Sequence, residues 1–107
     1  MQERWWASGH WQVKEGKTDE FIQQWRDWLT QSSENIAGFH QARLLRALNN
    51  PLQFTSISEW DDASSRDAWK TSPSFRAGFE ASKALCGEFI GGDYDEVVVV
   101  RPGTDQS

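Results

Sequence analysis

The sequence has little cysteine and few basic residues, and it lacks a long apolar run. A single cysteine, Cys86, leaves no second thiol for an internal disulfide or a metal cluster, so we expect a cytoplasmic protein without a metal site. The 11 Lys and Arg against 16 Asp and Glu give a net charge of −5, the wrong sign for neutralising phosphates. Nucleic acid and anionic membrane surfaces are therefore not expected partners.

Signals for secretion or membrane insertion are also missing from the sequence. No stretch approaches the roughly 18 apolar residues of a transmembrane helix. The first residues lack the basic flank and the apolar run of a secretory signal. We expect neither secretion nor insertion into a membrane.

The length of 107 residues predicts one domain over residues 1–107, with a core at about 5–101 and a frayed C-terminal tail. A chain of this size buries only roughly 60 to 65% of its unfolded surface when it folds alone. Its core is marginal unless a partner adds to it.

Tryptophan, in contrast, is abundant. The seven tryptophans are Trp5, Trp6, Trp11, Trp25, Trp28, Trp60 and Trp69. An indole fills a large volume and needs a partner for its N–H, so most of these residues should belong to the core.

Hydrophobic periodicity predicts a strand followed by a helix. Residues 5–14 alternate, with Trp5, Ala7, Gly9, Trp11 and Val13 on one face and Trp6, Ser8, His10 and Gln12 on the other. Thr18 or Asp19 is the expected cap of the helix. Its apolar stripe comprises Phe21, Ile22, Trp25, Trp28, Leu29 and Ser32.

The second half of the chain predicts a hairpin, two helices and a last strand. Runs at 39–48 and 52–60 flank an Asn-rich turn, and a short helix capped by Asp61 or Asp62 should follow. A further helix should begin at Ser72-Pro73, with Phe75, Phe79, Ser82, Cys86 and Phe89 along one side. The glycine pair 91–92 should end that pattern before a strand over Tyr94 and residues 97–100, which are all valine.

This order predicts an α+β fold, in which a ferredoxin-like four-stranded antiparallel sheet carries its helices on one face. Trp6 and His10 on the opposite face are too large or too apolar to remain in water. A second copy packed sheet to sheet would cover that face, so we expect a homodimer.

The sequence resembles the antibiotic biosynthesis monooxygenase family of dimeric α+β barrels over roughly residues 5–101. The resemblance rests on Val13-Lys14-Glu15-Gly16-Lys17, Gly38-Phe39, Asn50-Pro51, Glu59-Trp60-Asp61, Ala68-Trp69 and Ser72-Pro73-Ser74-Phe75, in that order. Each motif is weak alone, and their order and spacing carry the assignment. Because one fold supports many activities, the function must be argued from the site.

One chemistry that the resemblance implies is haem degradation. The family's asparagine, tryptophan and iron-binding histidine positions correspond to Gly9, Trp69 and Phe79. Phenylalanine cannot coordinate iron, which requires an axial donor such as His, Cys, Tyr or Met. We therefore expect neither haem binding nor haem degradation.

The other implied chemistry is cofactor-independent oxygenation of an aromatic or quinol-type substrate. The asparagine, tryptophan and tyrosine that such oxygenases carry around the end of the third strand correspond to Ser56, Trp60 and Arg66. The arginine on their last helix corresponds to a position near Glu80, and Arg76 lies one turn earlier. Trp60 and Trp69 are the candidate catalytic residues. The candidate substrate-binding residues are Gly9, Trp11, Ser56, Ser58, Phe75, Arg76 and Phe79.

The proposed ligand position rests on Gly9. A glycine inside a strand often marks a close approach to the backbone, here by an aromatic ring, although it can instead relieve a bulge or allow a tryptophan to pack. His10 and His40 are conceivable bases, although a lone strand histidine is more often structural. The alternative function is a non-catalytic dimer that binds a small molecule or is associated with stress.

Overall fold

The strands and helices follow one another along the chain in the order predicted from the sequence. The structure is a computed structural model, and it describes residues 4–103. The elements are β1 Trp5–Val13, α1 Thr18–Asn35, β2 Phe39–Arg46, β3 Gln53–Trp60, α2 Ala63–Lys70, α3 Pro73–Lys83 and β4 Cys86–Asp95. The predicted frayed tail after Gly103 lies outside the described residues.

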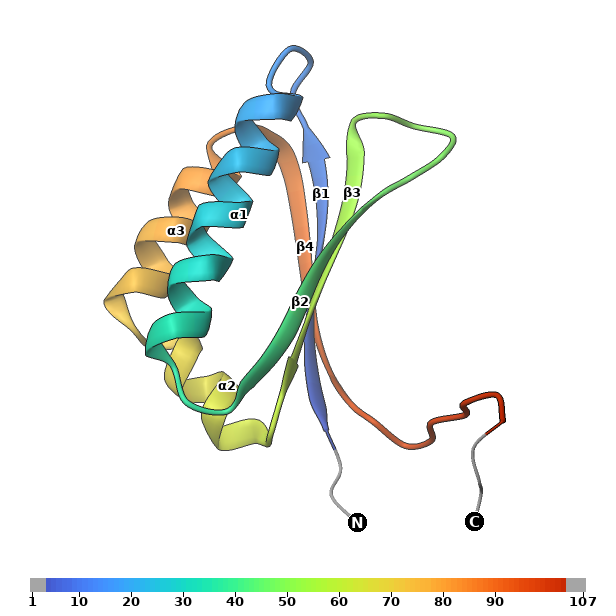
Figure 1. Ribbon diagram of the computed structural model, residues 1–107. Coiled ribbons are helices and arrows are strands. Elements are labelled where there is room, and N and C mark those ends of the chain that lie inside the picture. The colour runs from blue at the N-terminus through green and yellow to red at the C-terminus, as the bar shows by residue number, and fades with distance from the viewer. Residues whose placement is uncertain (1–3, 104–107) are drawn as a thin grey trace.

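The strands form an antiparallel sheet in the order β2-β3-β1-β4, and the helices lie on one of its faces (Figure 1). This arrangement confirms the predicted ferredoxin-like α+β fold. The opposite face carries no helix in the described part of the chain. One row across that face consists of Leu45, Thr55, His10 and Ile90, which are register partners on neighbouring strands.

The alternation predicted for the first strand is confirmed. Ala7, Trp11 and Val13 are buried against the helices, whereas His10 on the opposite face is exposed. In α1, the residues buried toward the sheet are Phe21, Trp28, Leu29 and Ser32, which belong to the predicted stripe. Periodicity therefore identified the inward faces of both elements.

Two of the three predicted helix starts are capped as expected. Asp62 Oδ1 accepts a hydrogen bond from the backbone N–H of Ser65 at 2.9 Å, and Ser72 Oγ accepts one from Phe75 at 3.1 Å. The predicted cap of α1 is wrong. Its N-cap position is Lys17, which makes no side-chain capping bond, and Thr18 is already helical.

The prediction for the last helix and strand is also wrong. Helix α3 ends at Lys83, and β4 runs from Cys86 to Asp95 through the glycine pair 91–92. The apolar spacing of the helix continues by coincidence into the strand at Cys86 and Phe89. Residues 97–100, the valine run, are exposed outside the sheet. Residues 86–95 form the strand instead, because their pairing with β1 outweighs the local strand propensity of the valines.

Among residues 4–103, no helix is long and apolar enough to cross a membrane.

Candidate active site

A cavity of about 210 Å³ lies between the inner face of the sheet and the helices. Its lining residues are Ala7, Ser8, Gly9, Trp11, Trp28, Ser56, Ser58, Trp69, Lys70, Phe75, Phe79, Phe89, Gly91, Gly92 and Asp93. They come from β1, β3, β4 and all three helices. The cavity therefore depends on the tertiary arrangement rather than on one loop.

Aromatic rings form most of its wall. The rings of Trp28 and Trp69 are stacked with centroids 5.7 Å apart, and those of Phe75 and Phe79 are also 5.7 Å apart and nearly parallel. On the sheet side, the centroids of Trp11 and Phe89 are 4.4 Å apart. These flat, apolar surfaces suit a planar aromatic ligand.

Buried serines accept hydrogen bonds from three indole N–H groups around this wall, whereas Nε1 of Trp28 has no partner within residues 4–103. Nε1 of Trp11 donates to Ser56 Oγ at 3.0 Å, and Nε1 of Trp60 donates to Ser58 Oγ at 2.9 Å. A third pair joins Trp69 Nε1 to Ser32 Oγ, also at 2.9 Å. The pairs hold the tryptophans in fixed orientations, because a buried N–H without a partner is costly.

Ser56 and Ser58 retain hydrogen-bonding capacity at the cavity. Each is over nine-tenths buried, and within residues 4–103 each hydroxyl oxygen accepts from one indole and makes no other hydrogen bond. A hydroxyl has one proton to donate as well as its lone pairs. Both serines can therefore donate to an oxygen of a bound ligand.

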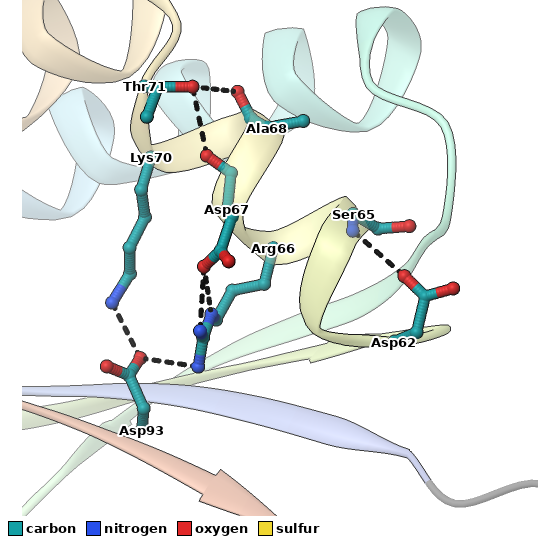
Figure 2. A network of polar contacts seen from close by, with 8 residues as sticks. All are labelled: Asp62, Ser65, Arg66, Asp67, Ala68, Lys70, Thr71 and Asp93. Atoms are coloured by element: carbon teal, nitrogen blue, oxygen red, sulfur yellow. Dashed lines mark hydrogen bonds and ion pairs between the residues drawn. The ribbon is translucent and has the colours of Figure 1, made fainter.

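The edge of the cavity carries opposite charges. Lys70 Nζ, at the end of α2, donates to Asp93 Oδ1 on β4 at 2.6 Å. Arg66 reaches the same oxygen from one turn earlier at 3.3 Å, and its guanidinium also contacts Asp67 at 2.7 Å (Figure 2). Two cations from α2 thus converge on one carboxylate of the sheet.

The position above Gly9 is occupied by protein. A Cβ at Gly9 would lie 2.8 Å from Phe89 Cε1 and 2.8 Å from Trp11 Nε1. Gly9 does line the cavity, as predicted, but its missing side chain also makes room for these two rings. At Gly91, which pairs with Gly9 across the strands, the nearest atom is Phe89 Cζ at 3.1 Å, so this position is less crowded.

The structure brings together most of the predicted site residues. Those that line the cavity are Gly9, Trp11, Ser56, Ser58, Trp69, Phe75 and Phe79. Sequence reasoning missed the other lining residues, which are Ala7, Ser8, Trp28, Lys70, Phe89, Gly91, Gly92 and Asp93. Phe89, Gly91 and Asp93 are alternate residues of β4, so a strand prediction at 86–95 would have indicated them.

Two predicted residues do not line the cavity. Trp60 is fully buried and stacks on Trp69 with ring centroids 4.9 Å apart, so Trp69 forms the wall instead. Arg76 is exposed. Phe75 and Phe79, four residues apart, face the sheet, and Arg76 points about 100° away from Phe75 around the helix.

Neither histidine reaches the cavity. His10 lies on the opposite face of the sheet, where Nδ1 is hydrogen-bonded to Thr55 Oγ1 at 3.1 Å. His40 contacts Asp61, and this hydrogen bond lowers the pKa of the Asp61 carboxyl below its usual range. The titratable groups that line the cavity, within the described chain, are therefore Lys70 and Asp93.

The other potential metal-binding and reactive groups lie elsewhere. In the part of the chain that the structure describes, no three His, Cys, Asp or Glu side chains come together to hold a metal ion. Cys86 is buried as predicted, at the start of β4, and burial raises the pKa of its thiol to about 11. Phe79, which corresponds to the iron-binding histidine of the haem-degrading enzymes, packs against Phe89 with ring centroids 5.0 Å apart.

The family comparison agrees with this architecture. A family model described as antibiotic biosynthesis monooxygenase matches residues 7–81, which extend from β1 almost to the end of α3. The matched residues include most of β1, all of β2 and β3, and most of the residues that line the cavity. No curated protein matches the chain.

Several solved structures share the fold at low sequence identity. A conserved protein from Methanosarcina mazei Go1 is 22% identical, with a TM-score of 0.79 over 88% of this chain and 93% of that one. Protein SO0527 from Shewanella oneidensis is 19% identical, with a TM-score of 0.79 over 92% and 96%. SnoaB, a cofactor-independent oxygenase from Streptomyces nogalater, is 17% identical, with a TM-score of 0.78 over 97% and 100%.

Proposed function

Because the chain belongs to the antibiotic biosynthesis monooxygenase family, we propose that it is a cofactor-independent monooxygenase acting on an aromatic or quinol-type small molecule. The observation that carries the proposal is the cavity with aromatic walls and two buried serine hydroxyls, Ser56 and Ser58. The SnoaB fold supports the same reaction class. Such a reaction needs a largely dry pocket that holds an electron-rich ring and a few polar groups.

The size of the cavity restricts the substrate. Its volume of about 210 Å³ exceeds the roughly 150 Å³ that accommodates benzene in an engineered cavity. It is smaller than the about 300 to 1,000 Å³ of sites for drug-sized ligands. We therefore propose a substrate with one or two fused rings.

The proposed reaction needs no reductant besides the substrate. A phenol loses its proton, dioxygen bonds to the ring carbon opposite the phenolate oxygen, and the resulting hydroperoxide loses water to leave a quinone. For 1-naphthol, one molecule of substrate and one of dioxygen give 1,4-naphthoquinone and one of water. The substrate supplies all the electrons.

The residues have distinct proposed roles. Trp69, Trp11 and Phe79 contact the faces and edges of the ring, and Ser56 donates to a substrate oxygen. Trp60 acts as a positioning residue behind Trp69, on which it stacks. These assignments modify the sequence-based hypothesis, in which Trp60 itself was a candidate catalytic residue.

The test is incorporation of isotope from labelled dioxygen. With 1-naphthol under ¹⁸O₂, the protein should produce 1,4-naphthoquinone that carries one labelled oxygen, as measured by mass spectrometry, faster than a buffer control. Gly91→Val should slow the reaction because its side chain enters the cavity. Gly87→Val on the same strand is the matched control, since a Cβ at Gly87 meets no atom within 4 Å.

A rate equal to buffer for 1-naphthol and other one- and two-ring phenols would refute the proposed activity. Equal slowing by Gly91→Val and Gly87→Val would refute the proposed position of the substrate.

A homodimer is part of the proposal. The helix-free face of the sheet exposes large side chains, including Leu45, Ile90 and Tyr94, at 50%, 58% and 54% of their surface. Residues 97–100 add a further exposed run of valines. Large exposed apolar side chains on one face are typical of a surface that a second copy covers.

Sedimentation equilibrium at micromolar concentration should give twice the chain mass. Ile90→Glu should shift the equilibrium toward the monomer, because it places a charge on this face. A wild-type protein that sediments as a monomer would contradict the dimer proposal.

The rival function is binding without catalysis. It is favoured by one observation, namely that the titratable groups lining the cavity are an ion pair, Lys70 and Asp93, and neither histidine reaches it. Ligand binding by calorimetry without isotope incorporation would support this alternative.

A further inference from the structure

We infer that Lys70 binds an ionised oxygen of the ligand at the edge of the cavity, while Ser56 and Ser58 donate to an oxygen inside it. The inference rests on the proposed function, because it assumes that the cavity binds an aromatic ligand. It narrows the substrate class to planar acidic phenols that also carry a ring carbonyl, such as hydroxyquinones. These compounds carry both a ring-bound oxyanion and a carbonyl oxygen.

The first argument is the placement of Lys70. Among the described residues that line the cavity, it is the one cation, and 35% of its side chain is exposed. The cavity wall beside it is mostly aromatic, so an oxyanion there has less water around it than in solution. A cation at such a boundary interacts more strongly with an anion than a freely exposed lysine does.

The second argument is that the surrounding contacts hold Lys70 in place. Its ammonium group donates to Asp93, and Arg66 binds the same carboxylate from the neighbouring turn of α2. Arg66 is itself held by Asp67, and 13% of its side chain is exposed (Figure 2). An ammonium has three donors, so Lys70 can contact a ligand oxygen without leaving Asp93.

Asp93 also opposes binding of an anion. Its carboxylate lines the cavity beside Lys70 and repels a ligand oxyanion at the same place. Asp93 is therefore a positioning residue, and removing its charge should strengthen anion binding.

The third argument is the pair of serines. The hydroxyl protons of Ser56 and Ser58 have no acceptor in residues 4–103, and each oxygen already accepts from an indole. They therefore need an acceptor such as a carbonyl oxygen, not a second donor. A ligand with a carbonyl at one end and an oxyanion at the other satisfies both parts of the site.

The experiment compares three two-ring probes by isothermal titration calorimetry at neutral pH. The probes are 2-hydroxy-1,4-naphthoquinone, which is anionic, and the neutral 2-methoxy-1,4-naphthoquinone and 1,4-naphthoquinone. Wild-type protein should bind the anionic probe about tenfold more tightly than the methoxy probe, as expected for one charge-assisted hydrogen bond.

Two variants and a control separate the roles of the charges. Lys70→Met should abolish the preference for the anionic probe and leave the methoxy probe unaffected. Lys17→Met changes the net charge equally but lies before α1 and pairs with Glu20, so it should retain the preference. Asp93→Asn keeps Lys70 and removes the competing anion, so it should tighten binding of the anionic probe severalfold.

The outcomes distinguish this inference from the proposed function. Equal affinity of wild-type protein for the anionic and methoxy probes, or equal effects of Lys70→Met and Lys17→Met, would overturn the role of Lys70 while leaving the cavity a ligand site. Weaker binding of the anionic probe by Asp93→Asn would overturn the role of Asp93. Failure of all three probes to bind would overturn both the inference and the proposed ligand site.

Discussion

Gly78 on α3 is the point where Trp28 of α1 packs directly on a helix backbone. A Cβ at Gly78 would lie 2.1 Å from Cδ1 and 2.3 Å from Cγ of the Trp28 ring. Carbon atoms normally pack at about 3.5 to 4.0 Å, so the ring would have to move by more than about 1 Å. Trp28 is buried and stacked on Trp69 in the cavity wall, so we expect Gly78→Ala to destabilise the protein.

The magnitude follows from two opposing effects. Replacing a helical glycine by alanine stabilises the helix by about 0.8 to 1 kcal/mol. Overpacking a rigid core costs about 1 to 3 kcal/mol, and the size of this overlap places Gly78 at the upper end. The net loss should be about 2 kcal/mol, which lowers the melting temperature of a domain this size by roughly 10 °C.

Urea unfolding followed by circular dichroism measures this loss, and a double-mutant cycle identifies its cause. In a Trp28→Phe background, the smaller ring should relieve the contact, so that Gly78→Ala becomes neutral or stabilising. Ala77→Gly, at the exposed neighbouring position, should cost about 1 kcal/mol through helix propensity alone. Stabilisation of the wild-type protein by Gly78→Ala would refute the reasoning.

Two further changes test the buried polar groups. Ser32→Ala should lower the free energy of unfolding in urea by about 1 to 3 kcal/mol, because it leaves the N–H of Trp69 without a partner. Ser33→Ala, at the exposed next position, should lower it much less, and equal losses for the two variants would contradict this reasoning. Burial raises the pKa of the Cys86 thiol to about 11, so the folded protein keeps a proton that the unfolded chain loses above its ordinary pKa of about 8.5. Stability should therefore fall by about 1 to 3 kcal/mol between pH 9 and about 11, and Cys86→Ala should reduce this slope in unfolding measured across that range; an unchanged slope would contradict the assignment.

The first strand, the first helix and the hairpin were predictable because their local pattern agrees with their packing. The alternation around Trp11 and the helical stripe through Phe21 both match the buried faces of the structure. At β4 the local pattern and the packing disagree. Phe79, Cys86 and Phe89 continue a helical spacing, although Cys86 and Phe89 belong to a strand that pairs with β1. Long-range pairing decides this segment, and periodicity cannot detect it.

The candidate site was predictable where its residues come from correctly predicted elements. Trp11, Ser56 and Phe79 were placed on the inner faces and do line the cavity. The ion pair of Lys70 and Asp93 was missed because it joins the end of one element to the misassigned strand. A polar contact between residues 23 positions apart leaves no local signal in the sequence.

The position of the cavity follows from where the inner face of the sheet lacks side chains. Gly9 and Gly91 are register partners on β1 and β4, so two neighbouring positions of that face carry none. Phe89 and Trp11 occupy the space at Gly9, whereas Gly91 is less crowded. Asp93 follows Gly91 by two residues on the same face, and this alternation places a carboxylate at the cavity edge. Gly91 therefore leaves room that a ring could occupy, and the alternation of β4 places the Asp93 carboxylate beside that room.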